Sequence, residues 1–172
     1  MAFVWDANKG FPPVMLSMAD VLYLEPPWKH GYNAFHEWAG VKPAVAWEAM
    51  MKRIGVGLAF ISKPAIVVAG KTALKYLQPD TARPALLNGD RCYVAAWRRP
   101  VFDDAAIDTE DVIRSLAKSY NVVGDPACGY GRSGRLFVEA GKRYVMSDVS
   151  ARCIGYIAAH DAGWGRQSGE VT

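Results

Sequence analysis

Residues 122–148, VVGDPACGYGRSGRLFVEAGKRYVMSD, constrain the fold of this chain more than any other stretch. A β-favouring run at 121–125 ends in Asp125, a glycine-rich loop follows, and a helix is predicted at 135–141. A second strand is predicted at 142–148. This order favours a parallel pair of strands in an α/β sheet, in which ligands lie outside the carboxyl ends of the strands.

The rest of the chain repeats this alternation of strands and helices. Further strands are predicted at 2–6, 20–25 and 64–70, with a hairpin at 82–97 that turns at Asn88-Gly89. Helices are predicted at 33–57 with a break near Pro43, at 71–78, at 108–120 with Asp108 or Thr109 as cap, and at 150–161. We expect one three-layer Rossmann-like α/β domain over 1–172, with a mostly parallel sheet, an antiparallel edge hairpin and a flexible tail at 163–172.

Composition narrows the class of protein. The 172 residues are 51% apolar and 22% charged, which supports a packed core and argues against disorder. The first ten residues lack the pattern of a signal peptide, and no apolar run reaches the length of a membrane span. The three cysteines lack metal-ligand spacing, so we expect a cytoplasmic protein with no disulfide, metal site or membrane partner. The net charge of +3 permits an anionic partner without requiring one.

The glycine loop indicates a nucleoside-containing cofactor. Gly129, Gly131 and Gly134 match G-x-G-x-x-G, and the acid that ends the next strand, Asp148, can accept hydrogen bonds from both ribose hydroxyls. NAD, FAD and a plain strand-turn-helix remain alternatives, since glycine motifs are weak evidence alone. A carboxylate at Asp125 is poorly placed for a pyrophosphate and favours a cofactor with positive charge, such as S-adenosylmethionine.

The stretch YLEPPWKHG, at 23–31, makes a rigid corner at the end of a predicted buried strand. Proline fixes the backbone, so Pro26 and Pro27 set the shape of the corner. The Glu25 carboxylate and the Pro26 carbonyl can each accept one hydrogen from an exocyclic amino group, while the Trp28 indole stacks on the ring that carries it. Two acceptors that hold the amine hydrogens favour a pyramidal nitrogen with a free lone pair.

Together the two motifs resemble the S-adenosylmethionine-dependent amino-methyltransferases of adenine N6 and cytosine N4. In that family an acid-or-amide, Pro, Pro and aromatic motif holds the target amine, and a D-P-F-x-G-x-G-like loop, here DPACGYG, holds the cofactor. The motif order resembles the circularly permuted branch. The resemblance covers about residues 2–160 and implies a methyltransferase domain that modifies DNA or another nucleic acid.

The resemblance assigns roles by position. Glu25, Pro26, Pro27 and Trp28 are the expected catalytic residues. The expected cofactor residues are Asp125, Pro126, Ala127, Gly129 and Gly131 for the methionine part, Asp148 for the ribose and Asp6 for the adenine. The aromatic-rich stretch at 28–38 is either a cover over a flipped base or a helix that packs on the sheet, and the expected nucleic-acid contacts are Lys29, His30, Tyr32 and Arg132.

Two departures from the family pattern bear on function. Glu25 stands where Asp, Asn or Ser is usual, and its extra methylene moves the carboxylate by roughly 1.5 Å. A catalytically weak or inactive binding or scaffold subunit is therefore an alternative. The segment RRPVFDDAAI, 98–107, is too short for the target-recognition domain found in many relatives. Base readout then needs a second copy of the chain or a separate subunit, or the specificity is weak.

The expected reaction is methyl transfer to an exocyclic amino group, first of all adenine N6 in DNA. Cytosine N4, RNA and a small nucleotide are the other substrates that the motifs allow. A nicotinamide or flavin oxidoreductase that uses the glycine loop is an alternative from a different class of enzyme.

Overall fold

Short apolar runs form the buried centre of the protein. In the computed structural model, which describes residues 1–164, Val21–Leu24 and Ala65–Ala69 are buried at every position. Strands that are buried on both faces belong to parallel sheets covered by helices on either side. The two runs therefore lie in the middle of the sheet rather than at its edges, and they pair with each other in parallel.

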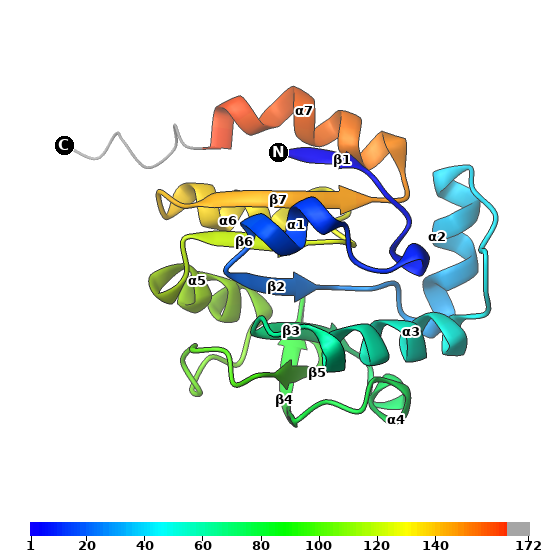
Figure 1. Ribbon diagram of the computed structural model, residues 1–172, viewed down its shortest axis with the longest axis horizontal. Helices are drawn as coiled ribbons and strands as arrows, with labels where there is room; N and C mark the ends of the chain where they lie inside the picture. The colour runs from blue at the N-terminus through cyan, green and yellow to red at the C-terminus, as the bar shows by residue number, and fades with distance from the viewer. Residues whose placement is uncertain (165–172) are drawn as a thin grey trace.

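The strands are β1 (Ala2–Val4), β2 (Val21–Leu24), β3 (Ala65–Ala69), β4 (Thr81–Leu87), β5 (Asp90–Trp97), β6 (Val122–Asp125) and β7 (Arg143–Asp148). Within the described residues these seven strands form one sheet in the order β1-β7-β6-β2-β3-β5-β4 (Figure 1). The pairs from β1 through to β3 are parallel, whereas β5 is antiparallel to both β3 and β4. This confirms the predicted fold class, with its antiparallel hairpin at one edge.

Helices cover both faces of the sheet. They are α1 (Pro13–Met18), α2 (Tyr32–Ala39), α3 (Trp47–Phe60), α4 (Leu74–Leu77), α5 (Thr109–Ser119), α6 (Arg132–Glu139) and α7 (Ala151–Trp164), with short 3-10 turns η1 (Ala7–Lys9), η2 (Lys29–Gly31) and η3 (Lys71–Ala73). Helices α5, α6 and α7 pack on one face through Ile113, Phe137 and Ile157, and α1 and α3 pack on the other through Met15 and Met51. Helix α2 lies beyond the sheet, at the end toward which β2 and β7 point (Figure 1). Up to residue 164, no helix has the length and apolarity to cross a bilayer.

The order of the chain through the sheet reverses between β2 and β6. From β6 the chain passes through α6 to β7 on one side, and from β2 it passes through α2 and α3 to β3 on the other. In open α/β sheets, ligands bind at the carboxyl ends of the strands where such a reversal occurs. Glu25 follows β2 directly and Asp125 ends β6, so the fold brings two carboxylates to this position.

The residue before Asp125 has no side chain, and the packing requires this. A Cβ atom at Gly124 would lie 2.7 Å from Met15 Cγ and 2.8 Å from both Ala19 Cβ and Leu22 Cδ2. Those atoms belong to α1, to the turn after it and to β2. Gly124 therefore lets β6 lie close to both neighbours, and it fixes the depth at which Asp125 enters the site.

The structure differs from the sequence prediction at several elements. Strand β1 ends at Val4, before the predicted end at Asp6, and α3 extends to Phe60, beyond the predicted end at residue 57. The sequence patterns do not predict α1, whose first residue, Pro13, suits a helix start because the N–H that proline lacks would be unpaired there. Helix α6 begins at Arg132, a turn earlier than expected. Helix α7 continues to Trp164, beyond the predicted start of a flexible tail, and the rest of that predicted tail, 165–172, lies outside the described residues.

We predict that Gly124→Ala lowers the free energy of unfolding by about 1–3 kcal/mol, because overpacking a filled core forces side chains or backbone to shift. Gly155→Ala is the control, since within residues 1–164 a Cβ built there meets no atom within 4 Å apart from its chain neighbours and the backbone of its own helix. This control should raise stability by up to about 1 kcal/mol through helix propensity. Urea unfolding of both variants measures the difference, and equal stability of Gly124→Ala and the natural chain would contradict the packing argument.

Candidate active site

Two loops meet where the order of the sheet reverses. The double-proline corner, residues 25–28, follows β2, and the glycine loop, residues 126–131, follows β6. Pro26 and Ala127 line the same cavity of about 40 Å³. Just beyond the glycine loop, Arg132 Nη1 lies 3.9 Å from Glu25 Oε1. The two motifs predicted from the sequence therefore share one site.

Asp125 organises the start of the glycine loop. Its Oδ1 accepts a hydrogen bond from the Ala127 N–H at 3.0 Å, across a turn at Pro126 and Ala127, and its Oδ2 accepts one from Ser133 Oγ at 2.6 Å. Burial raises the pKa of Asp125 to about 8, although these two hydrogen bonds oppose the rise. Ser133 is a site residue that the sequence prediction missed, because helix α6 was expected to begin after it.

Asp148 holds the middle of the same loop. Its Oδ2 accepts from the Gly129 N–H at 2.9 Å, and its Oδ1 accepts from the Ser150 N–H at 2.8 Å. Burial also raises the pKa of Asp148, against the effect of these backbone donors. Gly131 closes the loop with a φ of +80°, and a Cβ there would lie 2.8 Å from Trp164. The predicted ribose acid and the predicted loop glycines are thus held together in one hydrogen-bonded unit.

The two carbonyls of the double-proline corner have different environments within residues 1–164: the Pro27 carbonyl accepts a hydrogen bond, and the Pro26 carbonyl does not. The Pro27 carbonyl accepts a hydrogen bond from Trp47 Nε1 at 2.8 Å, which ties the corner to α3. No donor in residues 1–164 reaches the Pro26 carbonyl. The Trp28 ring is half-buried against the core beneath α5 and α6, and it meets His30 edge-on at 5.8 Å between centroids. The Pro26 carbonyl and the Trp28 ring are therefore free of contacts that would prevent a ligand from using them, and their predicted roles remain predictions.

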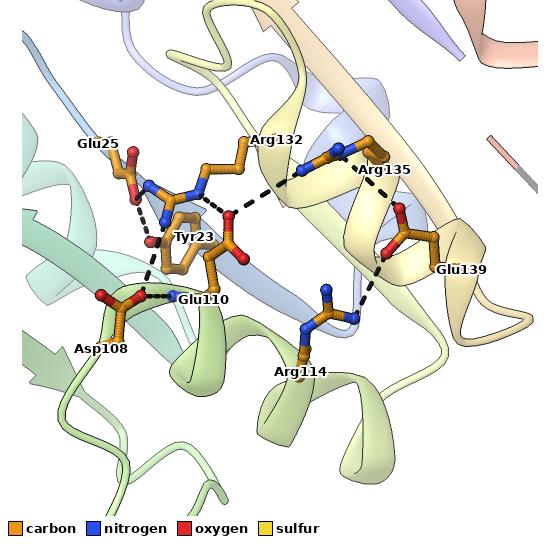
Figure 2. A network of polar contacts seen from close by, with 8 residues as sticks. All are labelled: Tyr23, Glu25, Asp108, Glu110, Arg114, Arg132, Arg135 and Glu139. Atoms are coloured by element: carbon orange, nitrogen blue, oxygen red, sulfur yellow. Dashed lines mark hydrogen bonds and ion pairs between the residues drawn. The ribbon is translucent and has the colours of Figure 1, made fainter. Parts of the chain in front are cut away.

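The Glu25 carboxylate lies on the side of the sheet that α5 and α6 cover (Figure 2). It accepts a hydrogen bond from the Tyr23 hydroxyl, and Arg132 approaches it from α6. Burial raises the pKa of Glu25, while Tyr23 and Arg132 oppose that rise. The sequence prediction missed Tyr23, although residues two apart on a strand share a face and could have been paired on that basis.

The four predicted nucleic-acid contacts have different environments. Lys29 is exposed and pairs with Glu48 at 2.7 Å. His30 is also exposed and, with Trp28, lines an open groove of about 550 Å³ next to the hairpin turn. Tyr32 is buried, and its hydroxyl donates to the Val45 carbonyl at 2.7 Å, so the structure does not present it to a nucleic acid.

The fourth predicted contact, Arg132, is not a free surface cation. Its guanidinium faces Glu25, Asp108 and Glu110, and its side chain is only 23% exposed. A phosphate contact at this position would have to compete with three carboxylates.

Asp6 lies on the far wall of the cavity, after β1. Its Oδ1 accepts from both the backbone N–H and the side-chain Nδ2 of Asn8, each at 2.9 Å, and so caps η1. Asn8 also lines the cavity, and its Oδ1 is buried without a hydrogen-bond partner in residues 1–164. An unpaired buried acceptor costs free energy until a donor reaches it. Asn8 is therefore a second candidate ligand contact that sequence reasoning missed.

Helix α2 closes the cavity from outside. Phe35 and His36 line it, and the buried His36 ring is held by its Nδ1, 2.8 Å from the Tyr32 carbonyl. The cavity volume of about 40 Å³ is well below the roughly 300–1,000 Å³ of typical ligand pockets. A nucleoside-sized ligand at this position requires Phe35 and His36 to move outward.

Comparison with solved structures agrees with this fold. The structure of TTHA0409, named a "Putative DNA Modification Methylase" from Thermus thermophilus, matches with a TM-score of 0.59 and 13% identity, over 99% of this chain and 96% of that one. M1.HpyAVI matches with a TM-score of 0.58 and 10% identity, over 93% of this chain and 97% of that one. The M1.HpyAVI-SAM complex matches with a TM-score of 0.57 and 9% identity, over 92% and 98% of the two chains. No protein-family model and no curated protein sequence matches the chain.

We predict that the stability of the protein falls as pH rises from 5 to 8. The raised pKa of Asp125 means that the folded protein holds a proton there up to about pH 8, whereas the unfolded chain loses it near the ordinary value of 3.8. The folded state then binds one proton more than the unfolded state, and stability decreases by about 1.4 kcal/mol per pH unit from this group. Asp125→Asn should flatten that slope in urea unfolding series, and the exposed Asp104→Asn control should not. An unchanged slope in Asp125→Asn would show that Asp125 is ionised in the folded protein at neutral pH.

Proposed function

We propose that the chain is an S-adenosylmethionine-dependent methyltransferase that acts on an exocyclic amino group of a nucleobase, with adenine N6 in DNA as first choice. One observation carries the proposal: Pro26 of the double-proline corner and Ala127 of the glycine loop line a single cavity. Arg132, just after the glycine loop, also lies 3.9 Å from the carboxylate of Glu25, the residue before Pro26. A target amine and a methyl donor must meet within one site, and this arrangement brings the two motifs together.

The residues around the cavity fit S-adenosylmethionine in their chemistry. Asp125, Asp148 and Glu25 are buried or largely buried acids whose pKa values burial raises. A positively charged ligand beside them would favour their ionised forms and lower these pKa values. The Asn8 Oδ1 atom is an acceptor without a partner from residues 1–164, suited to an amino group of the ligand. When bound, S-adenosylmethionine supplies a methyl group on a positively charged sulfur. Asp148 and Gly129 would hold the ribose end, and the Asp125 turn would hold the methionine end.

The corner residues perform the remaining tasks. The Glu25 carboxylate and the Pro26 carbonyl accept the two hydrogens of the target amine, which directs its lone pair toward the cavity. Trp28 stacks on the base and fixes its plane. Glu25 could also accept the proton that the nitrogen loses once it carries the new carbon. No covalent intermediate with the protein is required, in agreement with three buried cysteines.

The substrate is proposed to be a nucleic acid bound by more than this chain. Segment 98–108 between β5 and α5 folds back on the hairpin, with Leu86 N–H donating to Ile107 O at 2.9 Å, and it is too short for a recognition domain. We propose that sequence readout comes from outside these 172 residues, for example from a second copy of the chain or a separate subunit, or that sequence specificity is weak. The names of the two similar structures, a modification methylase and a protein solved with the same cofactor, favour DNA over RNA or a free nucleotide.

We predict that Glu25→Gln lowers methyl transfer at least a hundredfold and leaves S-adenosylmethionine binding within threefold of the natural chain. The amide keeps the size of the side chain but loses its charge and offers a donor where an acceptor is needed. Transfer of a labelled methyl group to unmethylated DNA measures the first effect, and calorimetric titration measures the second. Asp104→Asn is the matched control, because it neutralises an exposed acid outside the site.

The same measurements on the natural chain separate the alternatives. Binding of S-adenosylmethionine without transfer to DNA, RNA or nucleotides identifies a binding or scaffold subunit. Binding of NAD or a flavin in place of S-adenosylmethionine identifies an oxidoreductase and rejects the proposal.

A further inference from the structure

The Glu25 carboxylate is held from two sides (Figure 2). Tyr23 lies two residues earlier on β2, so both side chains leave the same face of the sheet. The Tyr23 ring is 1% exposed within the core beneath α5 and α6, and its hydroxyl donates to Glu25 Oε1. A buried aromatic ring with one polar tip is a rigid donor, because surrounding atoms leave it no other rotamer.

The second side of the carboxylate faces a guanidinium that is itself fixed. Arg132 Nη1 lies 3.9 Å from Glu25 Oε1, its Nε lies 3.2 Å from Glu110 Oε1, and its Nη2 lies 3.7 Å from Asp108 Oδ1. Asp108 caps α5 by accepting from the Glu110 N–H at 2.8 Å, so the two acids are anchored to the start of one helix. Arg132 is thus oriented by α5 while it approaches Glu25.

Both contacts fall on the same oxygen of Glu25. The Tyr23 hydroxyl and Arg132 Nη1 both lie next to Oε1 (Figure 2). Within residues 1–164, the hydrogen bonds and ion pairs of Glu25 involve Oε1 and not Oε2. Glutamate has one more rotatable bond than aspartate, so a free carboxylate at this position would sample several orientations. Fixing Oε1 removes that freedom and leaves Oε2 as the oxygen that a ligand can use.

We propose that Tyr23 and Arg132 are positioning residues, which hold Oε1 of the longer acid so that Oε2 meets the target amine. This inference rests on the proposed function, and it deepens it by explaining how glutamate serves where the family pattern has a shorter residue. An error of about 1 Å in such a position can cost on the order of a hundredfold in rate. The role also differs from the phosphate contact that the sequence suggests for Arg132.

The charges around Glu25 make the positioning role of Tyr23 and Arg132 measurable in the pH dependence of activity. Burial raises the pKa of Glu25, and both Tyr23 and Arg132 oppose the rise, so removing either raises this pKa further. If activity needs the ionised carboxylate, activity falls as the pH is lowered through the pKa of Glu25. A raised pKa therefore moves this acidic limb of the pH–activity profile to higher pH. The other titratable groups that face this carboxylate are Asp108 and Glu110 from α5, Cys92 from β5 and Asp125 from β6.

The first test is Tyr23→Phe, which deletes one hydroxyl and keeps the ring. We expect kcat to fall at least tenfold at pH 7, the acid limb to move to higher pH, and KM for DNA to change less than twofold. In a Glu25→Asp background, where the shortened acid no longer meets the hydroxyl, the same change should have less than a threefold effect. Tyr144→Phe is the matched control. It removes a tyrosine–carboxylate hydrogen bond of 2.7 Å, from Tyr144 on β7 to Asp161 on α7.

The second test is Arg132→Gln, with Arg135→Gln as control because Arg135 pairs with Glu110 and Glu139 but not with Glu25. In Arg132→Gln but not in Arg135→Gln, we expect kcat to fall and the acidic limb of the pH–activity profile to move to higher pH. The salt dependence of KM should stay unchanged. A raised KM with a shallower salt slope and an unchanged kcat would make Arg132 a phosphate contact and overturn its positioning role. Equal losses from Tyr23→Phe in both backgrounds would overturn the role of Tyr23.

A third readout separates this inference from the proposed function. If the natural chain transfers no methyl group to any substrate, the proposed function fails. The carboxyl carbon of Glu25, titrated by NMR in labelled protein, still tests the positioning contacts. Its pKa must rise in Tyr23→Phe and Arg132→Gln and stay constant in Tyr144→Phe and Arg135→Gln, and no change in the first pair would reject the inference.

Discussion

The parallel contact between β2 and β6 is the constraint on which the rest of the structure depends. Leu22 pairs with Gly124 in that ladder, and the absence of a side chain at Gly124 lets the two strands and α1 pack closely. Because the chain leaves the two strands in opposite directions along the sheet, their carboxyl ends stay open between the crossing helices. Glu25 and Asp125 therefore lie at the same edge of the sheet, and the loops that follow them line one cavity.

Burial of acids at this junction has an electrostatic consequence. Asp125 and Asp148 use their oxygens to hold the backbone of the glycine loop, yet burial still raises both of their pKa values. Below about pH 8, Asp125 is therefore protonated in the folded protein, and a cation bound beside it would favour the ionised carboxylate. The same acids thus shape the loop and would respond to the charge of a ligand.

The strand ends could be predicted from the sequence, whereas the contacts around them could not. Apolar runs mark buried parallel strands, and parallel strands share an edge, which places Glu25, Asp125 and Asp148 together. The start of α6 was misplaced because no side chain caps it and because Ser133 and Gly134 have low helix propensity. Packing overrides that propensity, since α6 lies so close to β7 that a Cβ at Gly134 would lie 2.4 Å from Met146. Because the sequence does not predict this helix start, it also does not predict Ser133 as the partner of Asp125.

Amide hydrogen exchange with and without S-adenosylmethionine tests the central claim, one shared site, most directly. The account predicts that the ligand slows exchange together in peptides that cover 23–32 at the corner, 126–135 in the glycine loop and 32–39 in α2. Helix α2 belongs to this set because Phe35 and His36 line the cavity and would contact a ligand there after moving outward to admit it. Protection of the glycine loop alone, with unchanged exchange at the corner, would contradict it.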